Sequence, residues 1–313
     1  MKKYIKIMRI DHWIKQLFIL PGVAFAMLLV PDPAENLPLR ILLGFLSTCF
    51  IASANYVINE WLDAAFDRFH PVKKHRTVVE NDVKKSVVYT LYAFLTVIGL
   101  CLAFLVSVPV FACELWLWVM GVLYNVKPIR TKDIPVLDVL SESVNNAIRL
   151  LIGWFIVTNV YLPPVSIIVG YWFGGAFLMD VKRFAEYRMI GDKKTASLYR
   201  KSFAFYDERI LLCMACFYAM ISSFFTGIFL IKYRVEFVVL MPVMIGMFCY
   251  YLFISFKEDS AVQAPERLYR EKGLMLFVLA FCVLFVLMLK VDIPALHGLL
   301  SDALLRFWNR YYE

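Results

Sequence analysis

Apolar residues occur along this chain in long runs, separated by short segments in which charged residues gather. A helix needs about 20 such residues to cross the hydrocarbon of a bilayer. The runs predict nine membrane-spanning helices, over residues 13–30, 39–58, 87–107, 109–125, 137–158, 161–179, 210–231, 237–256 and 273–290. Prolines set two boundaries, Pro109 between the third and fourth helices and Pro163-Pro164 between the fifth and sixth. We therefore expect an all-α, polytopic membrane protein with one transmembrane domain over residues 1–291.

Composition agrees with this pattern and excludes an ordinary soluble domain. The 313 residues are 61% hydrophobic and 19% charged, with a mean hydropathy of +0.69. All seven cysteines fall in predicted helices, so we expect no disulfide framework.

Lysine and arginine are divided unequally between the two sides of the predicted helices. If the N-terminus is cytoplasmic, the cytoplasmic segments hold 26 of the 33 Lys and Arg residues, and the outer segments hold 6. An excess of positive residues marks the cytoplasmic side. We therefore expect the N-terminus inside and the C-terminus outside, in a bacterial inner membrane. Most of the net charge of +8 then lies at one membrane face, so it does not call for a nucleic-acid partner.

Residues 292–313 keep helical spacing after the last predicted span. Apolar side chains such as Leu296, Leu300 and Phe307 recur against polar ones such as Asp302 and Arg306. This pattern is typical of an interfacial amphipathic helix.

The end of the second predicted helix carries an acidic face. If that helix continues past Ile58, Asn59, Asp63 and Asp67 lie at i, i+4 and i+8, and Glu60 falls within the same face, which is about 100° wide. Carboxylates at the negative end of a helix dipole repel one another unless a cation neutralises them. Mg²⁺ fits, because it takes a few protein oxygens together with phosphate oxygens of a substrate. We expect this face to hold Mg²⁺ and to be cytoplasmic.

Basic residues follow the acidic face directly. Arg68, Lys73 and Arg76 can bind the phosphate oxygens that Mg²⁺ leaves uncovered. The segment therefore predicts a site for a magnesium–phosphate group.

The fifth predicted helix carries a second polar stripe. Glu142, Asn145 and Arg149 lie on the same face as Asp138, at the start of the helix. Ionisable groups at membrane depth are costly and mark functional cavities. We expect this stripe to face the acidic cluster; the alternative is a structural Glu142–Arg149 ion pair that only orients the helices.

A third group follows the sixth predicted helix. Lys182 and Arg183 come at the end of that span, where long side chains reach a cavity mouth and an anionic substrate. A basic inner loop without a functional role is the alternative.

Together these motifs resemble the UbiA superfamily of intramembrane prenyltransferases, over nearly the whole chain. The resemblance rests on Asn59-Glu60-x-x-Asp63-x-x-x-Asp67 after the second span and on the acidic position before the fifth. Finer features resemble the branch of decaprenyl-phosphate phosphoribosyltransferases. They are Asp67-Arg68-x-His70-Pro71-x-Lys73-x-x-Arg76, the spacing from Lys132 through Asp138 and Arg149 to Gly153, Lys182-Arg183-x-Ala185-Glu186, and Arg200-Lys201-Ser202.

The resemblance implies an enzyme that transfers 5-phosphoribose from 5-phosphoribosyl diphosphate to a polyprenyl phosphate and releases diphosphate, for cell-envelope precursors. It implies that Asp138 joins Asn59, Glu60, Asp63 and Asp67 in holding Mg²⁺. The expected catalytic residues are Asp63, Asp67 and Lys73. The expected substrate-binding residues are Arg68, Arg76, Lys132, Glu142, Arg149, Lys182 and Arg183.

Two other functions remain open from the sequence. One is an aromatic prenyltransferase of the same superfamily, which takes a prenyl diphosphate as donor in quinone-type synthesis. The other is a transporter or lipid-binding protein without chemistry. The basic third group distinguishes the first of these from phosphoribosyl transfer, because a ribose 5-phosphate brings a second anionic end.

Overall fold

Every regular element in the described part of the chain is a helix. The computed structural model describes residues 2–69, 73–81, 83–257, 260–263 and 265–299. The longer helices are η1 (Ile10–Ile19), α2 (Leu20–Leu29), α3 (Leu37–Asp67), α5 (Lys85–Val106), α6 (Val108–Asn125), α7 (Leu137–Val157), α8 (Val165–Ile190), α10 (Glu208–Tyr233), α11 (Met241–Ser255) and α12 (Lys272–Met288). The shorter ones are α1 (Lys2–Ile7), η2 (Lys73–His75), α4 (Thr77–Glu80), η3 (Thr131–Asp133), α9 (Lys193–Tyr199), η4 (Lys201–Ala204), η5 (Val235–Leu240), η6 (Ala261–Gln263), η7 (Pro265–Arg270) and α13 (Pro294–Leu299). The all-α prediction is confirmed.

Each predicted span coincides with a helix, but the count of nine is not established. Seven helical stretches in the described residues are long and apolar enough to cross a membrane. The polar stripe of α7 and the 17-residue length of α12 leave these two helices outside that group. The protein is therefore an integral membrane protein with at least seven candidate spans.

The predicted boundaries have local causes. Ser107 caps α6 by accepting a hydrogen bond from the Val110 amide at 3.3 Å, and Pro109 occupies the first turn, where no amide donor is needed. Asp207 caps α10 in the same way, through the Ile210 amide at 2.8 Å. At the other end of a helix, α3 continues through Asp67, as the spacing of its acidic residues requires.

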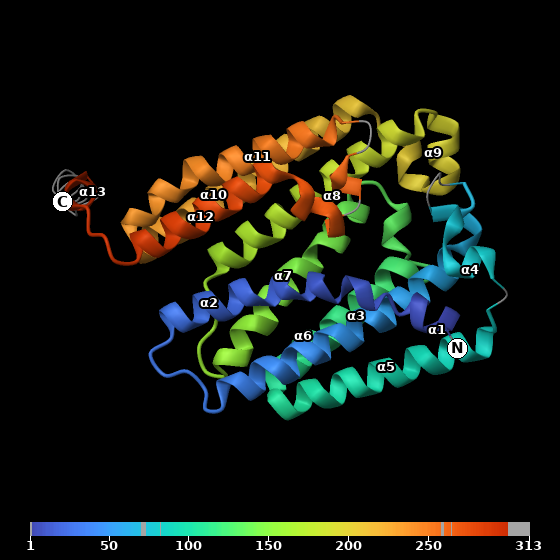
Figure 1. The fold of residues 1–313 in the computed structure, drawn as a ribbon, viewed down its shortest axis with the longest axis horizontal. Coiled ribbons are helices and arrows are strands. Elements are labelled where there is room, and N and C mark those ends of the chain that lie inside the picture. Colours follow the sequence, from blue (N-terminus) through green and yellow to red (C-terminus); the bar gives the residue numbers. More distant parts are fainter. Residues whose placement is uncertain (1, 70–72, 82, 258–259, 264, 300–313) are drawn as a thin grey trace, which may run out of the picture.

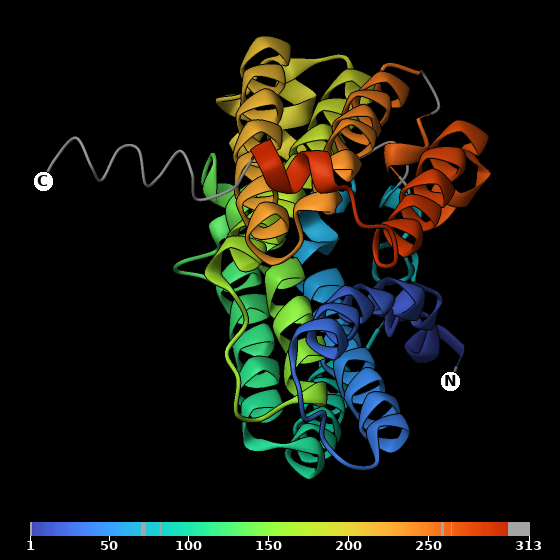
Figure 2. The same cartoon turned by 90° about the vertical axis from the view of Figure 1, so that its left-hand side faces the viewer.

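The helices lie side by side in a bundle, with α2, α3, α5 and α6 on one side of α7 and α10, α11 and α12 on the other (Figure 1). The end-on view shows the last long helix, α12, next to α2 (Figure 2). Phe25 and Phe285 join these two helices, with ring centroids 6.5 Å apart. The first and last long helices thus close the bundle.

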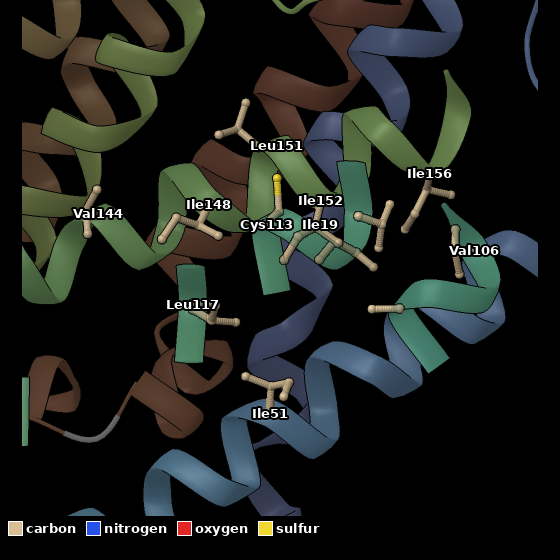
Figure 3. Close-up of a cluster of buried hydrophobic side chains, with 12 residues drawn as sticks. Ile19, Ile51, Val106, Cys113, Leu117, Val144, Ile148, Leu151, Ile152 and Ile156 are labelled. Atoms are coloured by element: carbon tan, nitrogen blue, oxygen red, sulfur yellow. The ribbon is translucent and has the colours of Figure 1, made fainter. Parts of the chain in front are cut away.

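The largest apolar core holds α7 against η1, α3, α5 and α6. It contains Ile148, Ile152 and Ile156 from one side of α7, with Ile19, Ile51 and Leu117 from its neighbours (Figure 3). Because α7 buries this side, its polar stripe must point toward another part of the bundle.

Glycines allow an unusually close approach between α2 and α7. A Cβ atom added at Gly22 would lie 2.0 Å from the Leu150 carbonyl oxygen, and one at Gly153 would lie 1.9 Å from the Ile19 carbonyl oxygen. Only glycine fits at either position, so these two residues set the position of α7 along the first helix.

At the end of the bundle opposite α4 and α9, Arg40 binds the last turns of two helices. Its guanidinium donates to the carbonyl oxygens of Val106 in α5 and Phe155 and Ile156 in α7, at 2.7–3.2 Å. These carbonyls have no partner within their own helices. Arg40 thereby fixes the ends of α5 and α7 relative to α3.

Candidate active site

A cavity of about 440 Å³ lies among η1, α3, α6, α7 and α8. Of the expected site residues, it is lined by Asn59, Asp63, Asp67, Lys73, Arg76, Glu142, Arg149, Lys182 and Arg183. The bundle therefore brings the acidic face of α3, the polar stripe of α7 and the basic end of α8 to one space.

The acidic face of α3 is held by cations. Asp63 Oδ1 pairs with Lys132 Nζ at 2.5 Å and with Arg130 at 2.8 Å, and Asp67 Oδ2 pairs with Arg76 at 2.7 Å. The Asn59 amide nitrogen donates to Asn125 Oδ1 at 2.5 Å. Each acidic side chain thus has a fixed orientation before any substrate binds.

The other oxygens on this face suit Mg²⁺. Asp63 Oδ2, Asp67 Oδ1 and Asn59 Oδ1 have no hydrogen-bond partner within the described ranges, and their residues line the cavity. Carboxylate and amide oxygens are the protein ligands that Mg²⁺ prefers. The donor set therefore fits the ion expected from the sequence.

Two expected residues of this segment lie elsewhere. Glu60 is buried outside the cavity lining and accepts a hydrogen bond from the Val78 amide at 3.3 Å, next to α4. Arg68 is exposed and does not line the cavity. Their expected roles as metal ligand and phosphate ligand stay predictions without geometric support here.

Asp138, the other expected metal ligand, also lies outside the cavity lining. It is fully buried and accepts hydrogen bonds from the hydroxyls of Ser202 at 2.9 Å and Tyr206 at 2.6 Å. The Tyr206 hydroxyl also accepts from the Val136 amide at 2.6 Å. In this arrangement Asp138 supports the start of α7.

Glu142 and Arg149 line the cavity but do not pair with each other. Glu142 is bound to Arg183 and accepts from the Tyr124 hydroxyl at 2.7 Å. Arg149 donates to Gln16 Oε1 at 2.8 Å and to Asn146 Oδ1 at 3.3 Å. The alternative of a Glu142–Arg149 ion pair is therefore not what α7 forms.

Arg183 joins the second and third groups. It is 1% exposed and pairs with Glu142 and, at 3.1 Å, with Glu186. Its charge is thus compensated within the protein, which makes Arg183 a support for the carboxylates around it.

Lys182 differs from its neighbour. It lines the cavity, and within the described ranges no carboxylate lies within ion-pair distance of its ammonium and no hydrogen bond engages it. Lys182 is therefore available to an anion in the cavity.

Lys73 connects the segment after α3 to the end of α8. Its ammonium contacts the Tyr199 hydroxyl and lies 2.7 Å from Glu186 Oε1. Since η2 contains Lys73, these contacts place the basic segment after α3 over the cavity.

Several site residues were given no role from the sequence, although Arg200 belongs to one of the motifs of the resemblance. Arg130 and Asn125 bind the acidic face, and Arg200 and Tyr199 line the cavity. The backbone of Arg130 is strained (φ 36°), and the sequence carries no signal of this.

Basic groups outside the spans have pKa values set by burial and by these acids. Burial lowers the pKa of Lys132 to about 8, with Asp63 acting in the opposite direction. For Arg76 burial is the largest single influence and lowers the pKa, but Asp67, Tyr199 and Glu60 together outweigh it and the pKa is raised. The pKa of Arg200 is also raised, because Tyr124, Tyr199 and Glu186 outweigh its burial. All three side chains are cationic at neutral pH.

A separate group of acidic and histidine side chains lies where the last described helix, α13, meets η5. Glu236 Oε1 lies 2.7 Å from His297 Nε2, and Asp292 Oδ1 lies 2.9 Å from the same nitrogen. Within the described ranges this is the one set of three His, Cys, Asp or Glu residues whose ligand atoms converge. The ion pairs join α13 to η5.

The protein is thus all-helical in its described residues, with a cavity lined by an acidic helix face and by cations. A sequence profile described as the UbiA prenyltransferase family matches residues 17–279. The chain belongs to the UbiA prenyltransferase family and is a transferase.

Curated relatives extend this result. The nodulation protein NoeC of Azorhizobium caulinodans is 27% identical over 222 residues, which are 70% of this chain and 69% of NoeC. Decaprenyl-phosphate phosphoribosyltransferases of Corynebacterium glutamicum and Mycolicibacterium smegmatis are 26% and 28% identical, each over 66% of this chain. The chain matches 60% and 63% of the length of these two enzymes.

Solved structures share the fold. A UbiA homolog from Archaeoglobus fulgidus bound to GPP and Mg²⁺ superimposes with a TM-score of 0.68 and 20% identity, over 92% of this chain and 100% of the homolog. A UbiA homolog from Aeropyrum pernix K1 gives a TM-score of 0.63 at 14% identity, over 89% of this chain and 99% of the homolog. The predicted family is confirmed.

Proposed function

We propose that this protein transfers 5-phosphoribose from 5-phosphoribosyl diphosphate to a polyprenyl phosphate in a Mg²⁺-dependent reaction that releases diphosphate. The observation that carries the proposal is Lys182, a cation that lines the cavity without a carboxylate partner in the described residues. A donor with a second phosphate gives this ammonium an anion to bind.

The acidic face of α3 would bind the diphosphate end of the donor through Mg²⁺. Asn59, Asp63 and Asp67 would hold Mg²⁺, which would neutralise charge on the departing diphosphate when bound. Lys73 and Arg76 also line the cavity, Arg76 beside Asp67, and they would bind the diphosphate oxygens that face away from the metal ligands.

The chemistry needs no dedicated base. The bond from the anomeric carbon to the diphosphate breaks, and an oxygen of the lipid phosphate forms the new bond to that carbon. The nucleophile is already an anion, so the protein's task is to orient the two substrates and to stabilise the departing charge. The cations and fixed carboxylates around the cavity are suited to that task.

Relatives give independent support for the substrates. Two curated relatives are named decaprenyl-phosphate phosphoribosyltransferases, and their matches cover 66% of this chain. We place the cavity mouth on the cytoplasmic side, with the N-terminus inside and the C-terminus outside, because the basic segments lie there. Residues 1–291 would form the transferase domain and residues 292–313 an interfacial helix, of which residues 300–313 lie outside the described residues.

The second candidate is transfer of a prenyl group from a prenyl diphosphate to an aromatic acceptor. The observation that favours it is the fold shared with archaeal UbiA homologs bound to GPP and to DMAPP. Under this reading Lys182 has no second phosphate to bind, so its loss should matter much less than the loss of Asp63.

Turnover decides between the candidates. Purified protein is supplied with labelled 5-phosphoribosyl diphosphate, a polyprenyl phosphate and Mg²⁺, and label in the lipid phase is measured. We expect metal-dependent lipid label that is lost in Asp63→Ala and kept in Glu208→Ala, which removes an exposed carboxylate on α10. No lipid label, with transfer from a prenyl diphosphate to an aromatic acid instead, would assign the second function.

A further inference from the structure

Arg149 is a cation inside the bundle whose hydrogen-bond partners are neutral. Its Nε and one terminal nitrogen donate to the carbonyl oxygens of Gln16 and Asn146, and within the described ranges no carboxylate lies within ion-pair distance. A guanidinium at membrane depth is costly without an anion. Because Arg149 lines the cavity, that anion can be a substrate.

Two nitrogen donors at this site, one of them on the guanidinium itself, have no hydrogen bond to a described residue. Arg149 Nη2 has no hydrogen bond to a described residue, and Gln16 Nε2 is buried without a partner in the same part of the chain. Gln16 is 0% exposed and is bound to Arg149 through its oxygen, so its amide group has a fixed position. Two donor groups held together in this way suit a phosphate monoester.

This group lies far from Lys182 along the bundle. Asn146, one turn before Arg149, lies against Gly175 of α8, and Lys182 is two turns further toward the C-terminal end of α8. With a rise of 1.5 Å per residue, Arg149 and Lys182 are about 15 Å apart along the helix axes. Arg149 and Lys182 therefore line well-separated parts of the cavity.

Exposed apolar side chains lie beside the Arg149–Gln16 pair. Ile14 and Phe18 flank Gln16 on η1, and both line the cavity while remaining 60% and 41% exposed. A long hydrocarbon chain can pass these side chains to reach the bilayer. A phosphate bound at Arg149 therefore fits a lipid better than a water-soluble sugar phosphate.

We propose that Arg149, positioned by Gln16, binds the phosphate head of the lipid acceptor and thereby selects a polyprenyl phosphate over an uncharged acceptor. The inference rests on the proposed function for its reaction. It adds the subsite of the acceptor: the lipid phosphate lies at Arg149, and the diphosphate lies at the acidic face of α3. Asn145 Oδ1, buried without a donor in the described residues and one turn before Arg149, suits a sugar hydroxyl between them.

The test compares Arg149→Gln and Arg149→Lys with Arg209→Gln, which removes the same charge from an exposed position on α10. The monodisperse elution of each purified variant checks folding. We expect Arg149→Gln to raise the KM for the polyprenyl phosphate at least 10-fold and the KM for the donor less than 2-fold. Arg149→Lys should lie between, and Arg209→Gln should match the unmodified protein.

A second experiment measures ligand binding and does not depend on turnover. The thermal shift produced by farnesyl phosphate should be lost in Arg149→Gln, while the shift produced by farnesol stays. A rise in the donor KM alone would assign Arg149 to the ribose 5-phosphate and overturn the inference, as would unchanged binding of farnesyl phosphate. If the unmodified protein makes no phosphoribosyl lipid, the proposed function fails, and the binding experiment still decides whether Arg149 is a site for a lipid phosphate.

Discussion

The ammonium of Lys73 lies 2.7 Å from the Glu186 carboxylate, which joins the segment after α3 to the end of α8. The two residues are 113 positions apart in the sequence and come from two different motifs. Glu186 also binds Arg183, so this contact connects the acidic face of α3 to the cations of the third group.

Replacing Lys73 by Met should weaken donor binding. Lys73 lines the cavity, whereas Arg68, five residues earlier, is exposed outside it. A hydrogen bond from a charged group contributes about 1.5–3 kcal/mol, so we expect the donor KM to rise about 10-fold or more in Lys73→Met. For Arg68→Met, steady-state kinetics should show that the donor KM changes less than 2-fold. Equal effects of both variants would mean that Arg68 reaches the substrate.

The carboxylates of α3 should differ in their importance. Asp63→Asn and Asp67→Asn keep the shape of the side chains but remove ligand charge, so turnover should fall at least about 100-fold. Glu60→Gln should keep most of the turnover, because Glu60 lies outside the cavity lining and faces α4. Titration of activity with Mg²⁺ measures both effects. If Glu60→Gln needs far more Mg²⁺ for the same activity, Glu60 is a ligand of the metal after all.

Gly153→Ala should disrupt the contact between α2 and α7. Its Cβ would lie 1.9 Å from a carbonyl oxygen, so the helices must separate, at a cost of about 3 kcal/mol or more. Gly227→Ala is the matched control, because its Cβ would meet only Met241 at 3.8 Å. Thermal unfolding in detergent should show a large drop in melting temperature for Gly153→Ala and no drop for Gly227→Ala.

Arg40→Met should lower stability without changing the chemistry. The substitution leaves carbonyl oxygens at the ends of α5 and α7 without their donor, at a cost of about 2 kcal/mol. Thermal unfolding should detect this, while KM values of the folded fraction stay within 2-fold. A selective change in KM would show that Arg40 acts on the cavity.

The contact between His297 and Glu236 should depend on pH. The hydrogen bond to Glu236 raises the pKa of His297 above its usual value near 6.5. The stabilisation is therefore complete below that usual value and is lost as the pH rises through the higher pKa of the folded protein. The melting temperatures of the unmodified protein and His297→Asn should differ at pH 6 and converge at pH 9. A difference that does not change with pH would show that charge is not involved.

The helices and the common cavity could be predicted because both depend on local periodicity. Runs of apolar residues gave the helix positions, and the spacing of Asn59, Asp63 and Asp67 gave one face that indeed lines the cavity. Arg149 and Lys182 were found in the same way. Periodicity states which residues share a face of one helix.

Periodicity does not state which neighbour covers that face. Glu60 lies at the edge of the acidic face, and α4 covers it. Asp138 shares a face with Glu142, yet Tyr206 and Ser202 pack over the first turn of α7 and bind its carboxylate. Arg130 was missed for the same reason, because its partner Asp63 is 67 residues away.

The close contact between Gly22 and α7 also bears on how the protein is made. The ribosome adds Gly22 about 130 residues before it adds Gly153. Until then α2 lies in the bilayer without α7, the helix that its Gly22 contacts. Assembly of the bundle around the cavity therefore becomes possible only after roughly half of the chain has been synthesised.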